Sequence, residues 1–259
     1  MTAARLEPAT GRIVTPEMLD RVPPVVRRYL NWAGVVGQPI PGSMALRQAG
    51  RIRPGAGRPW WRFTADQSFL MGLPAFGWLA HVRVAGLQLL RVRDSYVAGR
   101  GRMEVRFARV VPLANHRGDV LNEAALLRYL SEMVWFPAAF LLGNVEWRQL
   151  DQNTAQATIH DARLSATGTL RFDNHGRPLE FTARRGRHLG GNRFRADPWI
   201  VAYTAYGQLN GVRAPTEGWA GYCSPSGTQR YVELRVEPDL SPARAVSNAP
   251  AGRRSERRR

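Results

Sequence analysis

The sequence predicts an α+β protein built on a large, strongly curved antiparallel β-sheet with two main helices packed on it. Two observations predict this fold. Residues 43–113 and 155–237 largely alternate apolar and polar side chains, which is typical of strands with one buried and one wet face. Two other segments space their apolar residues three and four positions apart, as amphipathic helices do.

The two helices are expected at residues 24–33 and 122–134. Gly34 ends the first of them, because glycine readily adopts the left-handed conformation that terminates a helix. Either Asp119 or Asn122 caps the second, and Pro137 ends it.

The strands are expected to number nine or ten, arranged as an antiparallel meander. The turn signals between them include Gly99-Arg100-Gly101 and the run Asp173-Asn174-His175-Gly176. The clearest strands are residues 61–69, 78–84, 90–96, 103–107, 155–159, 164–172, 179–185, 199–206 and 231–237.

The composition predicts one folded domain at residues 15–238. Of the 259 residues, 44% are hydrophobic and 8 are tryptophan, which is enough for a sizeable core. Residues 1–14 are expected to be flexible. Residues 239–259 are rich in Pro, Ala, Ser and Arg with almost no large apolar side chain, so a disordered arginine-rich tail is expected.

The chain has a formal net charge of +17 and contains no lysine, so every basic residue other than histidine is arginine. An arginine surface can bind anions, but the complete lack of lysine favours codon bias as its origin. Without lysine the chain cannot be a standard P-loop nucleotide-binding protein, protein kinase or pyridoxal-phosphate enzyme, since each needs a lysine at its centre.

Cys223 is the only cysteine, which excludes an intramolecular disulfide and a cysteine-based zinc site. Residues 1–12 have no apolar core and predict no secretory signal. The longest apolar run, residues 133–142, is interrupted by Pro137 and is too short to cross a bilayer. We therefore expect a cytoplasmic protein that is at most peripheral to a membrane.

Two polar residues fall on apolar strand faces. Gln67 is in register with the aromatic residues of its strand, and Asp94 is in register with the aliphatic residues of its own. In the second helix, Arg128, Glu132 and Trp135 are spaced i, i+4 and i+7 and so share one face. If that face meets the sheet, the polar groups converge, either as a structural ion-pair network or as a polar pocket with aromatic walls.

No metal or cofactor site is predicted. The five histidines are scattered without metal-binding spacing, and Cys223 precedes a turn in a place that suits a small apolar residue. The strand arginines Arg91, Arg93, Arg102 and Arg106 point away from the apolar faces. They form either a solvated face or a surface that associates weakly and nonspecifically with anions or nucleic acid.

Three segments carry a resemblance: VPPVVRRYL at residues 22–30, DSY followed by GRGRM at 94–103, and LLRYLSEMVWFP at 126–137. Their order and spacing resemble a bacterial family of uncharacterised proteins that is catalogued only as a domain of unknown function, over about residues 21–236. This resemblance implies no activity and no catalytic residues. At the level of the fold, a curved antiparallel sheet crossed by helices is similar to the half-barrels of lipoprotein carriers.

The leading functional hypothesis is that the concave face of the sheet binds a small lipophilic or amphiphilic molecule. One alternative is an enzyme that uses Glu132 or Asp94 as a general base, although the sequence favours a binding protein. The other is a structural or anion-binding protein that acts through its arginine surface. The candidate ligand-binding residues are Trp61, Phe63, Gln67, Asp94, Tyr96, Arg128, Glu132 and Trp135.

Overall fold

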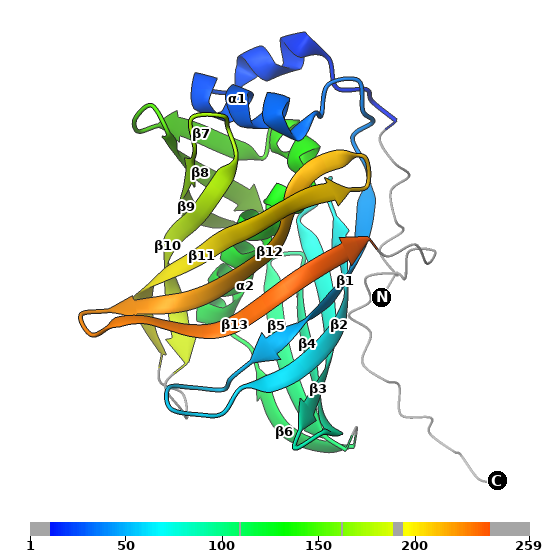
Figure 1. Ribbon diagram of the computed structural model, residues 1–259, viewed down its shortest axis with the longest axis vertical. Coiled ribbons are helices and arrows are strands. Elements are labelled where there is room, and N and C mark those ends of the chain that lie inside the picture. Colours follow the sequence, from blue (N-terminus) through cyan, green and yellow to red (C-terminus); the bar gives the residue numbers. More distant parts are fainter. Residues whose placement is uncertain (1–10, 109, 162, 189–193, 239–259) are drawn as a thin grey trace, which may run out of the picture.

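A computed structural model describes residues 11–108, 110–161, 163–188 and 194–238, which contain thirteen strands in one antiparallel sheet. The sheet curls strongly on itself, as Figure 1 shows, so the predicted fold class is confirmed. The tail at 239–259 lies outside the described residues, as do residues 1–10. Residues 13 and 14 were expected to be flexible, but Ile13 pairs with Pro39 and Val14 is buried.

The strand order shows how the two halves of the chain form one sheet. The chain begins in the middle of the sheet and proceeds outward through β1 to β6. It then crosses to the opposite edge and returns through β7 to β13, where β13 pairs with β1. The strands are β1 (Ser43–Ile52), β2 (Trp61–Leu70), β3 (Ala75–Val84), β4 (Leu87–Val97), β5 (Arg100–Phe107), β6 (Val111–His116), β7 (Val145–Gln149), β8 (Thr154–Asp161), β9 (Leu164–Phe172), β10 (Pro178–His188), β11 (Phe194–Leu209), β12 (Val212–Ser224) and β13 (Gly227–Pro238).

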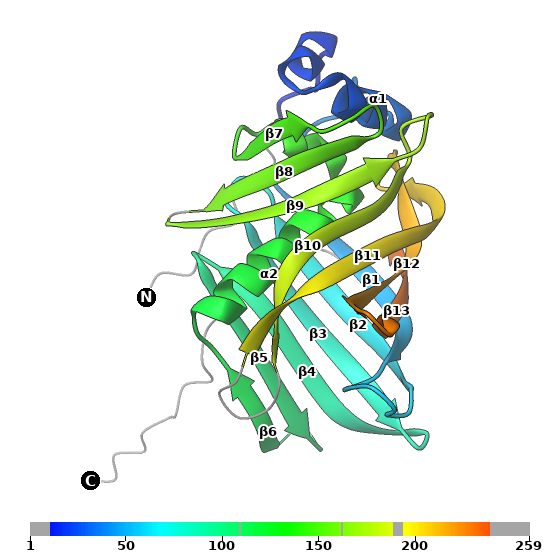
Figure 2. The same cartoon turned by 90° about the vertical axis from the view of Figure 1, so that its left-hand side faces the viewer.

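The long helix α2 (Asp119–Glu132) makes the crossing between the two edges. It lies inside the curve of the sheet, as Figure 2 shows, and contacts β4 and β5 of one arm and β9 and β10 of the other. Seven of its residues are buried, from Ala124 to Ser131. Because α2 fills the concave side, any ligand site on that side must lie between this helix and the sheet.

The remaining helices close one end of the curled sheet. They are η1 (Pro16–Arg21), α1 (Pro24–Ala33), η2 (Met133–Trp135) and η3 (Pro137–Leu141), of which η1, η2 and η3 are 3₁₀ helices. The apolar run after α2 is buried from Met133 to Phe140. Phe140 packs edge-to-face against Tyr29 of α1, so this run belongs to the core of the capped end.

The alternation of the sequence predicted the buried face of β2 correctly. In β2 the buried residues are Phe63, Ala65, Gln67 and Phe69, every second position. The strands singled out in the sequence leave out β1, β6, β7 and β12, and for the last three the physical reasons differ. The edge strands β6 and β7 are short and largely exposed, so they lack a buried alternating face. The strand β12 carries a proline, glycines and bulges that interrupt the period of two.

The start of α2 also differs from the prediction. The helix follows Gly118 directly, so Asp119 lies in its first turn and Asn122 lies within it. The Oδ1 of Asn122 accepts a hydrogen bond from the backbone N–H of Gly101 at 2.8 Å instead of capping the helix. This contact attaches the N-terminal part of α2 to the β4–β5 hairpin.

Candidate functional site

A chain of buried side chains links β3, β1 and β2 to α2. The indole Nε1 of Trp78 donates to Oε1 of Gln48 at 2.8 Å, and Nε2 of Gln48 donates to Oε1 of Gln67. Nε2 of Gln67 then donates to Oε2 of Glu132 at 2.7 Å. Because an indole N–H can only donate, Trp78 fixes the direction of every bond in this donor relay. The relay therefore ends on an acceptor, the Glu132 carboxylate.

Arg128 joins the Glu132 carboxylate to Asp94 on β4. Its Nε donates to Oε1 of Glu132 at 2.9 Å, one helical turn away, and its Nη1 donates to Oδ2 of Asp94 on β4 at 2.7 Å. The guanidinium also lies 5.0 Å from the ring centres of both Phe76 and Trp78. The predicted convergence of Gln67, Asp94, Arg128 and Glu132 is thus present.

The two carboxylates of this network, Glu132 and Asp94, differ in their surroundings. Burial raises the pKa of Glu132, and this effect is only partly opposed by Arg128 and by the hydrogen bond from Gln67. Burial alone would lower the pKa of Arg128, but Glu132 and Asp94 outweigh it and raise that pKa. Both Glu132 oxygens accept hydrogen bonds, whereas Oδ1 of Asp94 is buried without a partner among the described residues. Asp94 therefore has the open acceptor.

An inner cavity of about 200 Å³ adjoins this network. It lies between the C-terminal end of α2 and residues of β1, β3, β4, β5, β10, β11, β12 and β13. Asp94, Arg128, Glu132 and Trp135 all line it. The other lining residues are Ile52, Trp78, Val92, Met103, Ser131, Arg185, Trp199, Val201, Tyr203, Pro215, Thr216, Glu217, Gly218, Trp219, Ala220, Tyr231, Val232 and Leu234.

The other four predicted site residues do not line the inner cavity. Gln67 acts through Glu132, and Phe63 is buried edge-to-face against Trp78. Trp61 is half-buried at the start of β2. The hydroxyl of Tyr96 donates to Oδ2 of Asp161 at 2.7 Å, a contact that joins β4 to β8 across the open side of the sheet.

Sequence reasoning missed Arg185 on β10, which enters the cavity from the other arm. Its Nε donates to the backbone oxygen of Ala124 on α2 at 3.0 Å, and its guanidinium lies 4.8 Å from the ring centre of Trp199. One signal could have found it. Arg185 is in register with Phe181, which is fully buried, so it is a charged residue on an apolar strand face just as Asp94 is.

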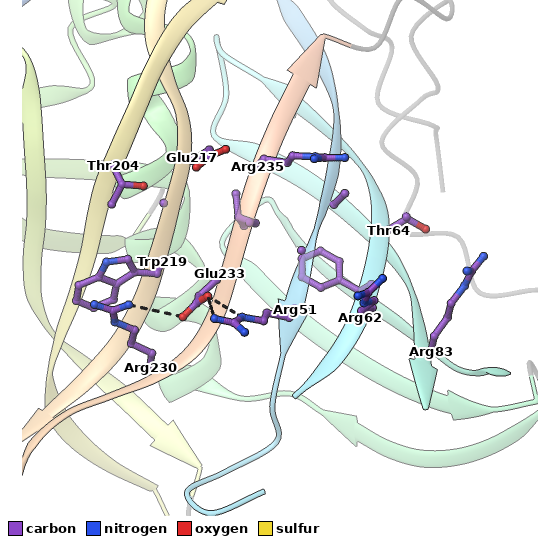
Figure 3. Close-up of a pocket in the computed structure, with 15 residues that line it drawn as sticks. Arg51, Arg62, Thr64, Arg83, Thr204, Glu217, Trp219, Arg230, Glu233 and Arg235 are labelled. Carbon is purple, nitrogen blue, oxygen red and sulfur yellow. Dashed lines mark hydrogen bonds and ion pairs between the residues drawn. The ribbon is translucent and has the colours of Figure 1, made fainter. Parts of the chain in front are cut away.

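A second hollow, the outer groove, lies on the convex side of the sheet and is open to solvent (Figure 3). It has a volume of about 740 Å³. Arg51, Arg62 and Arg83 are directly opposite one another on β1, β2 and β3. Glu233 pairs with Arg51 at 2.7 Å and lies 3.6 Å from Arg230. Anion binding by these exposed side chains stays a prediction.

Two structural features are absent from the described residues. No three His, Cys, Asp or Glu side chains in those residues are grouped so that they could hold a metal ion. None of the helices in the same part of the chain is both long and apolar enough to cross a membrane.

Comparison with known proteins supports the resemblance seen in the sequence. The model of a family of unknown function, DUF6544, matches residues 12–234, which include α2 and the whole polar network. The chain belongs to the DUF6544 family. No curated protein matches the chain.

Solved structures from other families are similar to the chain at low sequence identity. The chain is similar to a LolA superfamily protein from Nitrosomonas europaea, with 12% identity, a TM-score of 0.43, and coverage of 82% of this chain and 90% of that one. It is also similar to a DUF1329 family protein from Desulfovibrio piger, with 10% identity, a TM-score of 0.47, and coverage of 90% and 96%. The function of this DUF6544 member must therefore be argued from its own cavity.

Proposed function

We propose that this protein binds a small amphiphilic molecule in the inner cavity. The observation that carries the proposal is the combination of a partly enclosed, mostly apolar space with a few polar groups at its wall. Ligand sites in proteins have this composition, because apolar walls supply affinity and the few polar groups fix orientation. The cavity of about 200 Å³ is somewhat larger than an engineered apolar cavity of ~150 Å³ that holds benzene, so it suits a small ligand.

The shape of the fold supports this role. The donor relay and Arg128 attach α2 to the sheet by directional hydrogen bonds. Because these bonds fix the position of α2, the space between the helix and the sheet is kept open. Trp135 closes the cavity where α2 gives way to η2, and its ring packs edge-to-face against Phe69. A ligand in the cavity would supply van der Waals contacts that the lining side chains otherwise lack.

The first test uses native mass spectrometry of freshly purified protein, followed by organic extraction. A stoichiometric small amphiphile in the extract supports the proposal and names its class. The second test is calorimetric titration with octan-1-ol, a neutral probe with an apolar chain and one hydroxyl. We expect saturable binding with one site, because the probe matches the composition of the cavity wall.

The matched variants are Trp135→Ala and Trp60→Ala. Trp135 lines the cavity, whereas Trp60 lies in the loop before β2, where Arg51 and Arg53 stack on it. We expect the first variant to lose octanol affinity and the second to keep it, with both folded by near-ultraviolet circular dichroism. Equal affinity in two folded variants, or no octanol binding by the wild type, would reject the inner cavity as a ligand site.

A second candidate function follows from the free Oδ1 of Asp94. Glu132 is a poor general base, because both of its oxygens already accept hydrogen bonds. Asp94 has one buried oxygen without a described partner, so an enzymatic role would fall to this residue. Proton exchange of small ketones in deuterated water, followed by NMR, tests this role. Equal exchange rates for wild type and Asp94→Asn would remove the enzyme alternative.

A further inference from the structure

Arg185 differs from Arg128, the other arginine of the inner cavity, because it has no carboxylate within ion-pair distance in the described part of the chain. Its contacts are the Ala124 carbonyl, the Trp199 ring and two tyrosine hydroxyls, those of Tyr222 and Tyr231, each 3.4 Å from Nη1. A buried cation without a counter-ion is unfavourable, since its hydration is lost and only weak contacts replace it.

Arg128, in the same cavity, is an arginine whose charge is balanced by carboxylates. Its guanidinium meets two carboxylates at 2.7 Å and 2.9 Å. Both oxygens of Glu132 are therefore engaged, Asp94 is engaged through Oδ2, and neither residue is an ion-pair partner of Arg185. Burial opposes the charge of Arg185, but the two neighbouring tyrosines and Asp94 keep its pKa above the ordinary value. The guanidinium is therefore charged, and its Nη2 has no described hydrogen-bond acceptor.

A second donor beside Arg185 also lacks an acceptor. The hydroxyl oxygen of Tyr231 accepts from Nε1 of Trp199 at 3.1 Å and from Arg185. Both neighbours can only donate, so the Tyr231 proton must point elsewhere, and no acceptor for it is present among the described residues. Burial raises the pKa of Tyr231, so this proton is retained. Tyr222 differs, because its hydroxyl donates to the backbone oxygen of Gly186 at 3.3 Å.

We infer that Arg185 and Tyr231 bind the carboxylate of the ligand, so that the inner cavity takes a small apolar carboxylic acid. This inference rests on the proposed function and adds the ligand's chemical class. A carboxylate has two oxygens that only accept, which is what a guanidinium and a neighbouring hydroxyl proton require. The apolar part then lies along Trp199 and Trp135, which line the same cavity.

The experiment compares probes that share one chain length and differ only in the head group. Wild-type protein is titrated at neutral pH with octanoate, octan-1-ol and octylamine. We expect octanoate to bind most tightly, because it alone supplies an anionic acceptor to Arg185. Removal of one charge-assisted contact costs about 1.5–3 kcal/mol, so Arg185→Gln should weaken octanoate binding by roughly 10- to 100-fold. Octanol affinity should change less than about threefold.

Arg184→Gln is the matched control, since Arg184 is the adjacent residue but is exposed and donates to the Ala196 carbonyl on the outside of the sheet. It should leave octanoate binding unchanged. Tyr231→Phe removes only a hydroxyl and serves as a second variant should Arg185→Gln fail to fold. We expect it to weaken octanoate binding and to spare octanol binding.

A failure of the carboxylate site and a failure of the proposed function give different results. Octanol binding that equals octanoate binding in the wild type, with no effect of Arg185→Gln or Tyr231→Phe on octanoate, overturns the carboxylate site and leaves the proposed function standing. Tighter binding of octylamine would also overturn it. If none of the three probes binds, the inner cavity is not a ligand site and the proposed function fails together with this inference.

Discussion

The side-chain amide of Gln67 donates to the carboxylate of Glu132 at 2.7 Å, and this bond joins β2 to the C-terminal end of α2. Gln67 is 2% exposed, so neither of its polar atoms can turn to solvent instead. Its Oε1 accepts from Gln48, which in turn accepts from Trp78. A change at Gln67 therefore interrupts the donor relay at its middle.

We predict that Gln67→Leu lowers the free energy of unfolding by about 1–3 kcal/mol, because the Gln48 amide loses its acceptor inside the core. Urea unfolding followed by circular dichroism measures the change. Thr64→Val is the control, since Thr64 lies on the exposed face of the same strand. Equal stability of the two variants would show that the relay contributes nothing to stability.

Replacement of Arg128 by methionine should destabilise the protein by about 3–5 kcal/mol, because Asp94 and Glu132 would remain as buried carboxylates without a cation. The control is Arg27→Met, which removes an ion pair with Asp20 at the surface. The Arg27 side chain is 45% exposed, so this loss should stay below about 1 kcal/mol.

The same network allows a stricter test of the mechanism. If the loss in Arg128→Met comes from uncompensated charge, neutralising both acids should restore stability. We therefore expect the triple variant Asp94→Asn, Arg128→Met, Glu132→Gln to unfold at a higher urea concentration than Arg128→Met alone. A triple variant that unfolds at a lower urea concentration than Arg128→Met would show that the lost contacts are packing contacts and not electrostatic ones.

Much of this network could be predicted from the sequence because the relevant patterns are local. A period of two placed Gln67 and Asp94 on buried strand faces, and a helical period placed Arg128 and Glu132 together. The direction of the sheet's curvature then brought the two sets into contact. A polar residue that interrupts an apolar face was the useful signal in each strand.

The remaining parts depend on long-range pairing, which the patterns do not contain. Gln48 meets Gln67 only because of the register between β1 and β2, and Arg185 arrives from the far arm of the sheet. Alternation also does not say how far along a strand the cavity extends. For this reason Trp61 and Tyr96 were predicted at the cavity wall, although neither is among the residues that line it.

The buried position of Glu132 predicts a pH dependence of stability. Burial raises its pKa in the folded protein above the ordinary value of 4.5, so the folded state holds this proton at pH values where the unfolded chain has released it. The contribution of Glu132 to the free energy of unfolding must then fall as the pH rises above 4.5. Glu132→Gln lacks the titrating group.

Parallel urea titrations of the wild type and Glu132→Gln from acidic to neutral pH provide the measurement. We expect the wild type to lose stability relative to the variant as the pH increases through this range. A stability difference that stays constant, or that moves in favour of the wild type, would mean that Arg128 and Gln67 outweigh burial at this site.

Gly50 marks the seam where the two halves of the chain meet, because it pairs with Leu234 between β1 and β13. A Cβ atom at Gly50 would lie 2.0 Å from the backbone oxygen of Glu233 and 2.8 Å from the Cα of Leu234. Backbone atoms cannot rotate away, so Gly50→Ala must push the two strands apart. We expect a loss of about 1–3 kcal/mol, the usual range for overpacking.

Gly72→Ala is the control, since a Cβ at Gly72 would meet nothing within 4 Å. Hydrogen exchange distinguishes a local effect from a general one. In Gly50→Ala the amide protons of β1 and β13 should lose protection more than those of β8 and β9, which lie in the far arm. Uniform loss would instead mean that the seam opens only when the whole sheet unfolds, because the arms depend on it for their common curvature around α2.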